Sequence, residues 1–221
     1  MWLRTHIGTA VLGAIVFGPV TAYAQPNWDV SGGIGLFAGH TPTQDDRPYA
    51  DEWFHTVQAS LVVGAYLTPH VKLEVDASLT GSGHWFEERL VHLPGNPAPY
   101  PIFAEVEASV RSIGTSLVWQ FRNNEWVHPF VRAGVAAEFD RREVHVWEQI
   151  YYPRDPREGA LPTPVVQPGV RVSTVSRARA VLGGGAKFYM TQRAFVRTEG
   201  LATFDDERQN VAFRIGAGID F

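Results

Sequence analysis

The twelve residues from Asn210 to Phe221 read NVAFRIGAGIDF, and apolar side chains occupy every second position among them. A period of two is typical of a β-strand with one apolar face, because successive side chains of a strand point to opposite sides. The segment ends on the aromatic Phe221, although the terminal residues of soluble domains usually fray in water. The stretch therefore predicts a final strand whose apolar face and aromatic end are held by something other than bulk water.

The same alternation recurs in seven earlier segments. These predicted strands cover 27–37, 53–67, 71–81, 105–122, 130–140, 177–189 and 194–204. In each of them one face is nearly free of charge and the other face carries the polar side chains. Within 105–122 the apolar positions change parity near Gly114, so we expect a β-bulge at this glycine.

The connections between the predicted strands alternate in length. Long loops span 38–52, 82–104 and 141–173, whereas 68–70, 123–128 and 190–192 are short; the last connection, 205–208, is short as well. Long loops on one side and short turns on the other are typical of outer-membrane barrels with both termini in the periplasm. The sequence therefore predicts an all-β fold, a transmembrane antiparallel up-and-down β-barrel of about eight strands.

Aromatic residues provide a second indication of a bilayer. Trp and other aromatic side chains gather at the two membrane interfaces of spanning proteins. With the first strand rising from the periplasm, one group of rings falls near the periplasmic rim and another near the outer rim. The first group is Trp28, Trp119, Phe121, Phe188 and Phe221, and the second is Trp53, Phe139 and Phe204.

The N-terminal segment has the layout of a secretory signal peptide. It carries one cation, Arg4, then an apolar run from Ile7 to Val20, and then Ala22-Tyr23-Ala24. We expect residues 1–24 to be removed and residues 25–221 to form the barrel. The chain has 0 Cys and a formal net charge of −4 with its bases dispersed, so the composition favours neither a disulfide framework nor a nucleic-acid partner.

Three stretches carry a resemblance to a known family: HPFVRAGVAAEF (128–139), GGGAKFYMTQRAFVRTEG (183–200) and the final NVAFRIGAGIDF. They resemble the outer membrane protein β-barrel domain family, the relatives of the small OmpA-like and opacity-type barrels. The resemblance implies a location in the cell outer membrane of a Gram-negative cell, with outer-membrane lipids around the barrel. It transfers no catalytic residue.

The last strand also resembles the insertion signal of such barrels, which the barrel-assembly machinery reads during biogenesis. The signal is apolar at alternating positions and ends in phenylalanine. The matching residues are Phe213, Ile215, Ala217, Ile219 and Phe221.

The charged faces of the predicted strands point into the barrel. The expected lumen charge network comprises Glu74, Asp76, Glu105, Glu107, Arg111, Arg132, Glu138, Arg177, Arg179, Lys187, Arg197, Glu199 and Arg214, with Asp29, Lys72, Asp140 and Asp220 on the same faces. A barrel of about eight strands is just wide enough for its own side chains to fill, and buried charges must pair. We therefore expect a plugged, salt-bridged lumen rather than an open pore.

Two classes of function remain open at this stage. The favoured one is a small outer-membrane barrel with a structural or binding role; the alternative is a lipid A-modifying enzyme of the deacylase or acyltransferase type. GSGHWFEERL (81–90) contains the residue types for such an enzyme in Ser82, His84, Glu87 and Glu88, but no spacing of a nucleophile with its base. A soluble lipocalin-like barrel is a distant alternative. We predict no enzyme activity, no cofactor and no metal.

The longest predicted loop is the best candidate for binding an unidentified extracellular ligand. It combines exposed aromatic residues with arginines, which are common at interface hot spots, namely Trp147, Tyr151, Tyr152, Arg154 and Arg157. The competing interpretation, which we favour, is that 143–151 and 165–173 merely extend the flanking strands as a hairpin above the membrane.

Overall fold

The computed structural model describes residues 27–41, 52–92, 99–121, 124–147, 149–151, 163–166, 168–206 and 209–221. The predicted signal peptide lies outside the described residues. Among the described residues, no helix is long and apolar enough to cross a membrane.

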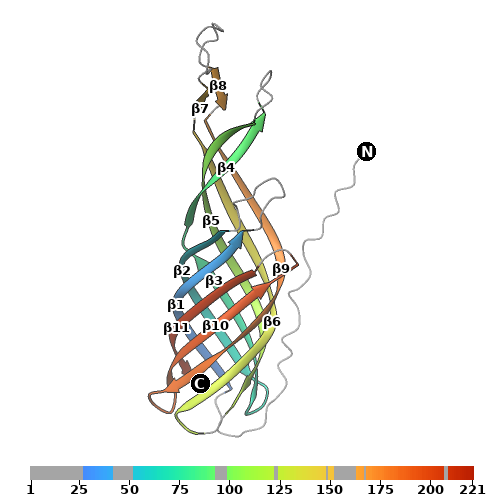
Figure 1. Cartoon of the computed structure of the whole chain (residues 1–221). Helices are drawn as coiled ribbons and strands as arrows, with labels where there is room; N and C mark the ends of the chain where they lie inside the picture. The colour runs from blue at the N-terminus through green and yellow to red at the C-terminus, as the bar shows by residue number, and fades with distance from the viewer. Residues whose placement is uncertain are drawn as a thin grey trace, which may run out of the picture.

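Nine strands form one closed sheet (Figure 1). They are β1 (Trp28–Thr41), β2 (Glu52–Tyr66), β3 (Val71–Thr80), β4 (Gly83–His92), β5 (Pro99–Gln120), β6 (Val127–Val146), β9 (Gly169–Tyr189), β10 (Ala194–Phe204) and β11 (Gln209–Asp220). The order β3-β2-β1-β11-β10-β9-β6-β5-β4 closes on itself because β3 also pairs with β5. β4 continues β3 along the same side of β5, so β3 and β4 together count as one barrel strand. The barrel therefore has eight strands, and all neighbouring strands are antiparallel. The predicted fold class is confirmed.

The β-bulge lies on a different strand from the predicted one. The register of β5 against β6 is continuous from Ala104↔Val146 to Gln120↔Phe130, so Gly114 is not a bulge and that prediction is wrong. The parity changes instead where β3 passes into β4, at Gly81 and Ser82: Thr80 points inward and so does Gly83. Glycine suits this position because a bulge bends the strand sharply.

The outer wall of the barrel carries an apolar band. On β11 and at Phe221 directly after it, the five predicted insertion-signal positions point outward, and Phe213 and Phe221 are 58% and 63% exposed. On β5 the band runs from Phe121 up to Ile113 and stops at the outward Arg111. At about 3.3 Å per residue and a tilt of about 40°, the rise from Phe121 to Arg111 is about 25 Å, the height of the apolar band of an outer-membrane barrel.

Four strands continue beyond this band. Figure 1 shows β4, β5, β6 and β9 rising on one side above the ends of the other strands, with β7 (Gln149–Tyr151) and β8 (Thr163–Val166) paired at the tip. The sequence assigns 82–104 and 141–173 to loops, but the described residues of these two ranges are largely strand. The hairpin interpretation of 141–173 agrees with this, because β6 and β9 stay in register up to Val146↔Gly169.

Candidate functional site

The lower lumen holds a network of buried charges contributed by most of the strands. Five carboxylates face five cations there: Asp29, Glu74, Asp76, Glu199 and Asp220, with Lys72, Arg132, Lys187, Arg197 and Arg214. All ten residues are at most 7% exposed. Equal numbers of opposite charges allow the network to be neutral, which is the condition for burying ions at tolerable cost.

Glu74 on β3 lies at the centre of this network. Arg197 of β10, on the opposite wall, donates to both of its carboxylate oxygens, at 2.6 and 2.9 Å. Lys72 forms an ion pair with the same carboxylate, and Arg132 Nη1 lies 3.8 Å from it. A bidentate arginine fixes a carboxylate in direction as well as in distance. The pair therefore ties two walls of the barrel together through the lumen.

Other pairs extend the network from Glu74 in both directions. Towards the chain termini, Lys187 bridges Asp29 and Asp220, and Tyr189 donates to Asp220 at 2.6 Å. Towards the extracellular side, Arg132 binds Asp76 at 2.6 Å and Glu199 at 2.9 Å. Each of these pairs joins residues of different strands. The network thus links the strands of the barrel to one another through the lumen.

A second, smaller cluster lies closer to the extracellular end. Glu138 accepts hydrogen bonds from Thr203 at 2.7 Å and Asn210 at 2.9 Å, and it forms an ion pair with Arg179 at 2.7 Å. Arg179 also contacts Asp140 at 3.3 Å and Asp205 at 3.2 Å. The predicted lumen residue Arg177 points inward as well but is partly exposed, with Asp205 at 3.7 Å.

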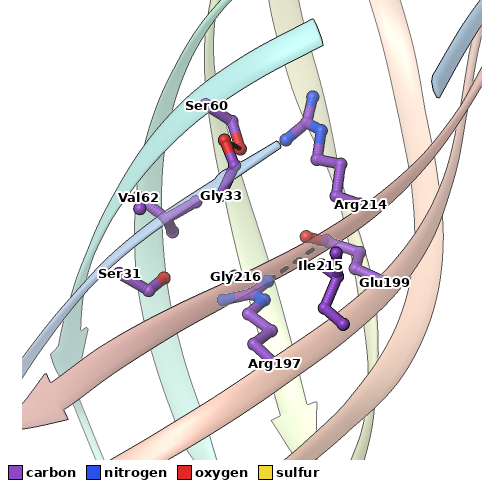
Figure 2. Close-up of a pocket in the computed structure, with 10 residues that line it drawn as sticks. Ser31, Gly33, Ser60, Val62, Arg197, Glu199, Arg214, Ile215 and Gly216 are labelled. Atoms are coloured by element: carbon purple, nitrogen blue, oxygen red, sulfur yellow. Dashed lines mark hydrogen bonds and ion pairs between the residues drawn. The ribbon is translucent and has the colours of Figure 1, made fainter. Parts of the chain in front are cut away.

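These side chains leave little free space in the described part of the lumen. One cavity of about 10 Å³ lies among Ser31, Ser60, Arg197, Glu199 and Arg214, and Figure 2 shows the guanidinium of Arg197 pointing towards the carboxylate of Glu199 there. Another, of about 20 Å³, separates the lower network from the upper cluster. A cavity needs about 10–15 Å³ to hold one water molecule. Each space can therefore hold about one water.

Glycines in the wall make room for the charged side chains. Gly64 of β2 pairs with Asp29 of β1, and a Cβ atom at Gly64 would lie 2.2 Å from Asp29 Oδ1. A Cβ atom at Gly134 would lie 2.4 Å from the hydroxyl of Ser116, which binds Arg132. The small residues of the inner wall are thus part of the network, because larger side chains would displace its members.

Three residues assigned to the lumen network point outward instead. Glu105, Glu107 and Arg111 are on the outer face of β5, whose inward positions there are Ala104, Val106, Ala108 and Val110. The prediction failed because β5 keeps its parity while its surroundings change: below Arg111 the outer face is apolar, and above it the outer face is charged. The other ten predicted network residues face the lumen.

The outer face of the extension carries its own polar contacts. The imidazole of His84 lies 3.7 Å from Glu105, and Glu143 pairs with Arg141 and His145, each at 3.1 Å. Glu107 has its pKa lowered from the usual value, first because it is hydrogen-bonded to the Ser82 side chain. Among the described residues, no group of three or more His, Cys, Asp or Glu could hold a metal ion.

The candidate enzyme residues do not converge. Ser82, His84 and Glu88 are exposed on the outside of the wall, whereas Glu87 points inward and pairs with Arg142. The Ser82 side chain is bonded to a carboxylate rather than to an imidazole that could activate it.

The predicted loop-binding residues are only partly described. Trp147 is 45% exposed and contacts Phe86 with ring centroids 6.0 Å apart. Tyr151 belongs to β7, but its side chain is not described, and Tyr152, Arg154 and Arg157 lie outside the described residues.

Several partners in the lumen were not identified from the sequence. Gln58, Tyr66, Ser116, Thr203 and Asn210 all contribute hydrogen bonds to the network. Thr203 and Asn210 share the inward parity of the charged residues on β10 and β11, so that parity was the signal by which these two could have been found. The described charged residues of β5 point outward, so they gave no such signal for Ser116.

Solved structures share this architecture. Neisserial surface protein A superimposes with a TM-score of 0.56 over 90% of this chain and 100% of its own, at 10% identity. The chain folds as a small outer-membrane β-barrel. Ail of Yersinia pestis (TM-score 0.47, 13% identity, 87% of this chain and 98% of that one) and the N-terminal barrel of Pseudomonas aeruginosa OprF (0.43, 14%, 89% and 99%) are also similar. No protein-family profile and no curated protein sequence matches the chain.

The resemblance predicted from the sequence is thereby confirmed as one of fold. At such low identities the comparison shows the fold alone.

Proposed function

We propose that this protein is a structural outer-membrane barrel of a Gram-negative cell and that its N-terminal signal peptide directs its export. The barrel anchors and displays an extracellular β-hairpin extension. The observation that carries the proposal is the inversion of polarity across one wall: an apolar outside about 25 Å high and an inside crossed by paired charges. A soluble binding barrel of the lipocalin type would need the opposite arrangement, with an apolar lumen and a polar exterior.

A role in diffusion of solutes is disfavoured by the lumen itself. The bidentate pair of Arg197 with Glu74 crosses it, and the cavities beside the pair hold about one water each. Opening a path would require breaking buried ion pairs and leaving their charges without partners in the lumen. The lumen therefore serves stability rather than transport.

Lipid A modification is the second candidate, and the geometry supports it less well. An acyl-transfer site needs a nucleophile within hydrogen-bonding distance of its base. The Ser82 side chain is hydrogen-bonded to Glu107 instead, and the imidazole of His84 lies 3.7 Å from the Glu105 carboxylate. We therefore propose that the barrel is not an enzyme. We propose likewise that Trp147 and the residues that follow it bind an extracellular ligand.

The test is to express the full-length chain and follow its location, its conduction and its effect on lipid A. We expect detergent-extractable protein in the outer membrane, a gel band that migrates differently when boiled, no stepwise conductance in planar bilayers and lipid A of unchanged mass. Protein in the aqueous periplasm with no heat shift would contradict the membrane placement. Stable conductance steps would contradict the plugged lumen. A gain or loss of an acyl chain on lipid A that disappears in Ser82→Ala would support the alternative of a lipid A-modifying enzyme.

A further inference from the structure

Three large aromatic side chains gather on the outside of the extracellular extension. Phe86 of β4, Phe103 of β5 and Trp147 after β6 are 66%, 49% and 45% exposed. Phe86 and Trp147 are in ring contact, and Phe103 is next to Ala104, whose register partner Val146 precedes Trp147. We call these three residues the aromatic platform. Exposed apolar patches rimmed by polar residues usually mark interaction sites.

The aromatic platform lies well above the hydrocarbon of the bilayer. On β5, Arg111 is the first outward charge above the apolar band, and Phe103 is eight residues further along the strand. At about 3.3 Å per residue and a tilt of about 40°, Phe103 lies about 20 Å above that boundary. The platform is therefore too high to contact acyl chains or the phosphates at their boundary.

The direction in which the platform points selects its neighbour. Phe103 is on the same face of the same strand as Leu117 and Trp119, which face lipid lower down. It therefore faces sideways, in the plane of the membrane, rather than upward into the medium. At that height and in that direction a barrel in the outer leaflet meets the saccharide headgroups of the surrounding lipids.

The chemistry of the rim indicates which saccharides fit. Below the platform lie Glu105, Glu107 and Glu143 with His84 and His145, and Arg141 is the cation paired among them. Three carboxylates face one arginine in this rim, which makes it acidic, so phosphorylated or sulfated sugars are repelled. Carboxylates held by their neighbours still have free lone pairs that accept hydrogen bonds from hydroxyl groups. Flat aromatic rings pack against the C–H faces of pyranose rings.

We propose that the aromatic platform binds uncharged hexose units of the outer-leaflet glycolipids that surround the barrel. The inference rests on the outer-membrane placement proposed above and adds a ligand class to it. Its consequence is a lateral contact that holds one class of lipid headgroup against the extension formed by β4, β5 and β6.

The experiment measures retention of glycolipid on the purified full-length mature barrel in detergent, by native mass spectrometry. The probes are lipopolysaccharide with an uncharged hexose outer core and the deep-rough form that ends in the phosphorylated inner sugars. We expect the parent protein to retain the first form at least fivefold better. Phe86→Ala and Phe103→Ala should abolish the preference, whereas Trp126→Ala, an exposed aromatic 61% accessible in the turn at the opposite end, should keep it.

Several results would overturn the inference. Equal retention of both forms by the parent, or an unchanged preference in Phe86→Ala and Phe103→Ala, removes the evidence for a hexose site. A dimer of the parent that both variants lose would identify the platform as a contact between two copies instead. A boiled-versus-unboiled gel separates the two proposals: a parent without a heat shift fails the outer-membrane proposal, and a heat-shifted parent without preference fails this one alone.

Discussion

Replacing Glu74 by glutamine tests whether the lumen network stabilises the barrel. The substitution preserves volume, so it leaves no cavity and changes only charge and hydrogen bonding. It removes one of the two oxygens that accept hydrogen bonds from Arg197, at 2.6 and 2.9 Å, and the negative charge that pairs with Lys72, in a side chain that is 0% exposed. The new amide group also brings donors towards cations.

The expected magnitude follows from leaving buried charge without its partner. Removing one member of a buried pair costs about 3–5 kcal/mol. With a urea dependence of about 2 kcal/mol per molar, the midpoint of unfolding should fall by about 2 M. Refolding into lipid vesicles, followed by urea titration with the boiled-versus-unboiled gel shift as readout, measures this change.

Two controls make the result interpretable. Glu107→Gln changes a carboxylate on the outer face of β5, outside the lumen network, and should leave the urea midpoint close to that of the parent. Glu74→Met with Arg197→Met removes both charges, and it should be less destabilising than the sum of the single substitutions, because an apolar pair leaves no orphaned ion. A urea midpoint of Glu74→Gln within about 0.3 M of the parent would refute the claim that the lumen network stabilises the barrel. So would a double Met variant whose destabilisation equals the sum of those of the two single Met variants.

Three further outcomes are expected. Leu182→Arg places a charge on the lipid face of β9, where Leu182 is 50% exposed, and should cost about 2–4 kcal/mol and impair insertion into vesicles, whereas Leu182→Phe should be nearly silent; equal insertion of both would exchange the inside and outside assigned here. Deleting Phe221 should sharply lower the amount of protein in the outer membrane by fractionation, while the inserted remainder keeps nearly the parental heat stability; normal membrane levels would show that the ring is dispensable for biogenesis. Ser82→Ala should raise the pKa of Glu107, measured by NMR titration, because the hydrogen bond from Ser82 lowers it. A carboxyl group with a lowered pKa stabilises the fold at pH values above its unfolded-state pKa, and this contribution is lost as the pH falls through the folded-state pKa. An unchanged pKa in the variant would contradict the hydrogen bond between Ser82 and Glu107.

Much of the fold is contained in local sequence. The side chains of a strand alternate with a period of two whatever its neighbours are, so the apolar and charged faces of β1, β6, β10 and β11 could be assigned before any pairing was known. The same parity identified ten of the thirteen lumen residues. Charge balance then favoured a plugged lumen, because a barrel of this size has no room for unpaired ions.

The tertiary structure decided which of these residues meet. Arg197 and Glu74 are 123 residues apart and come together only because the closed sheet places β10 opposite β3. It also decided the two points on which the sequence misled. A change in the polarity of alternate residues along β5 can mean a slip of parity or a change of surroundings, and no local pattern distinguishes them. Only the register, which runs past Gly114 without interruption and puts the bulge at Gly81 and Ser82, shows that β5 passes from lipid into water, because the polarity that a face needs is set by the medium it meets.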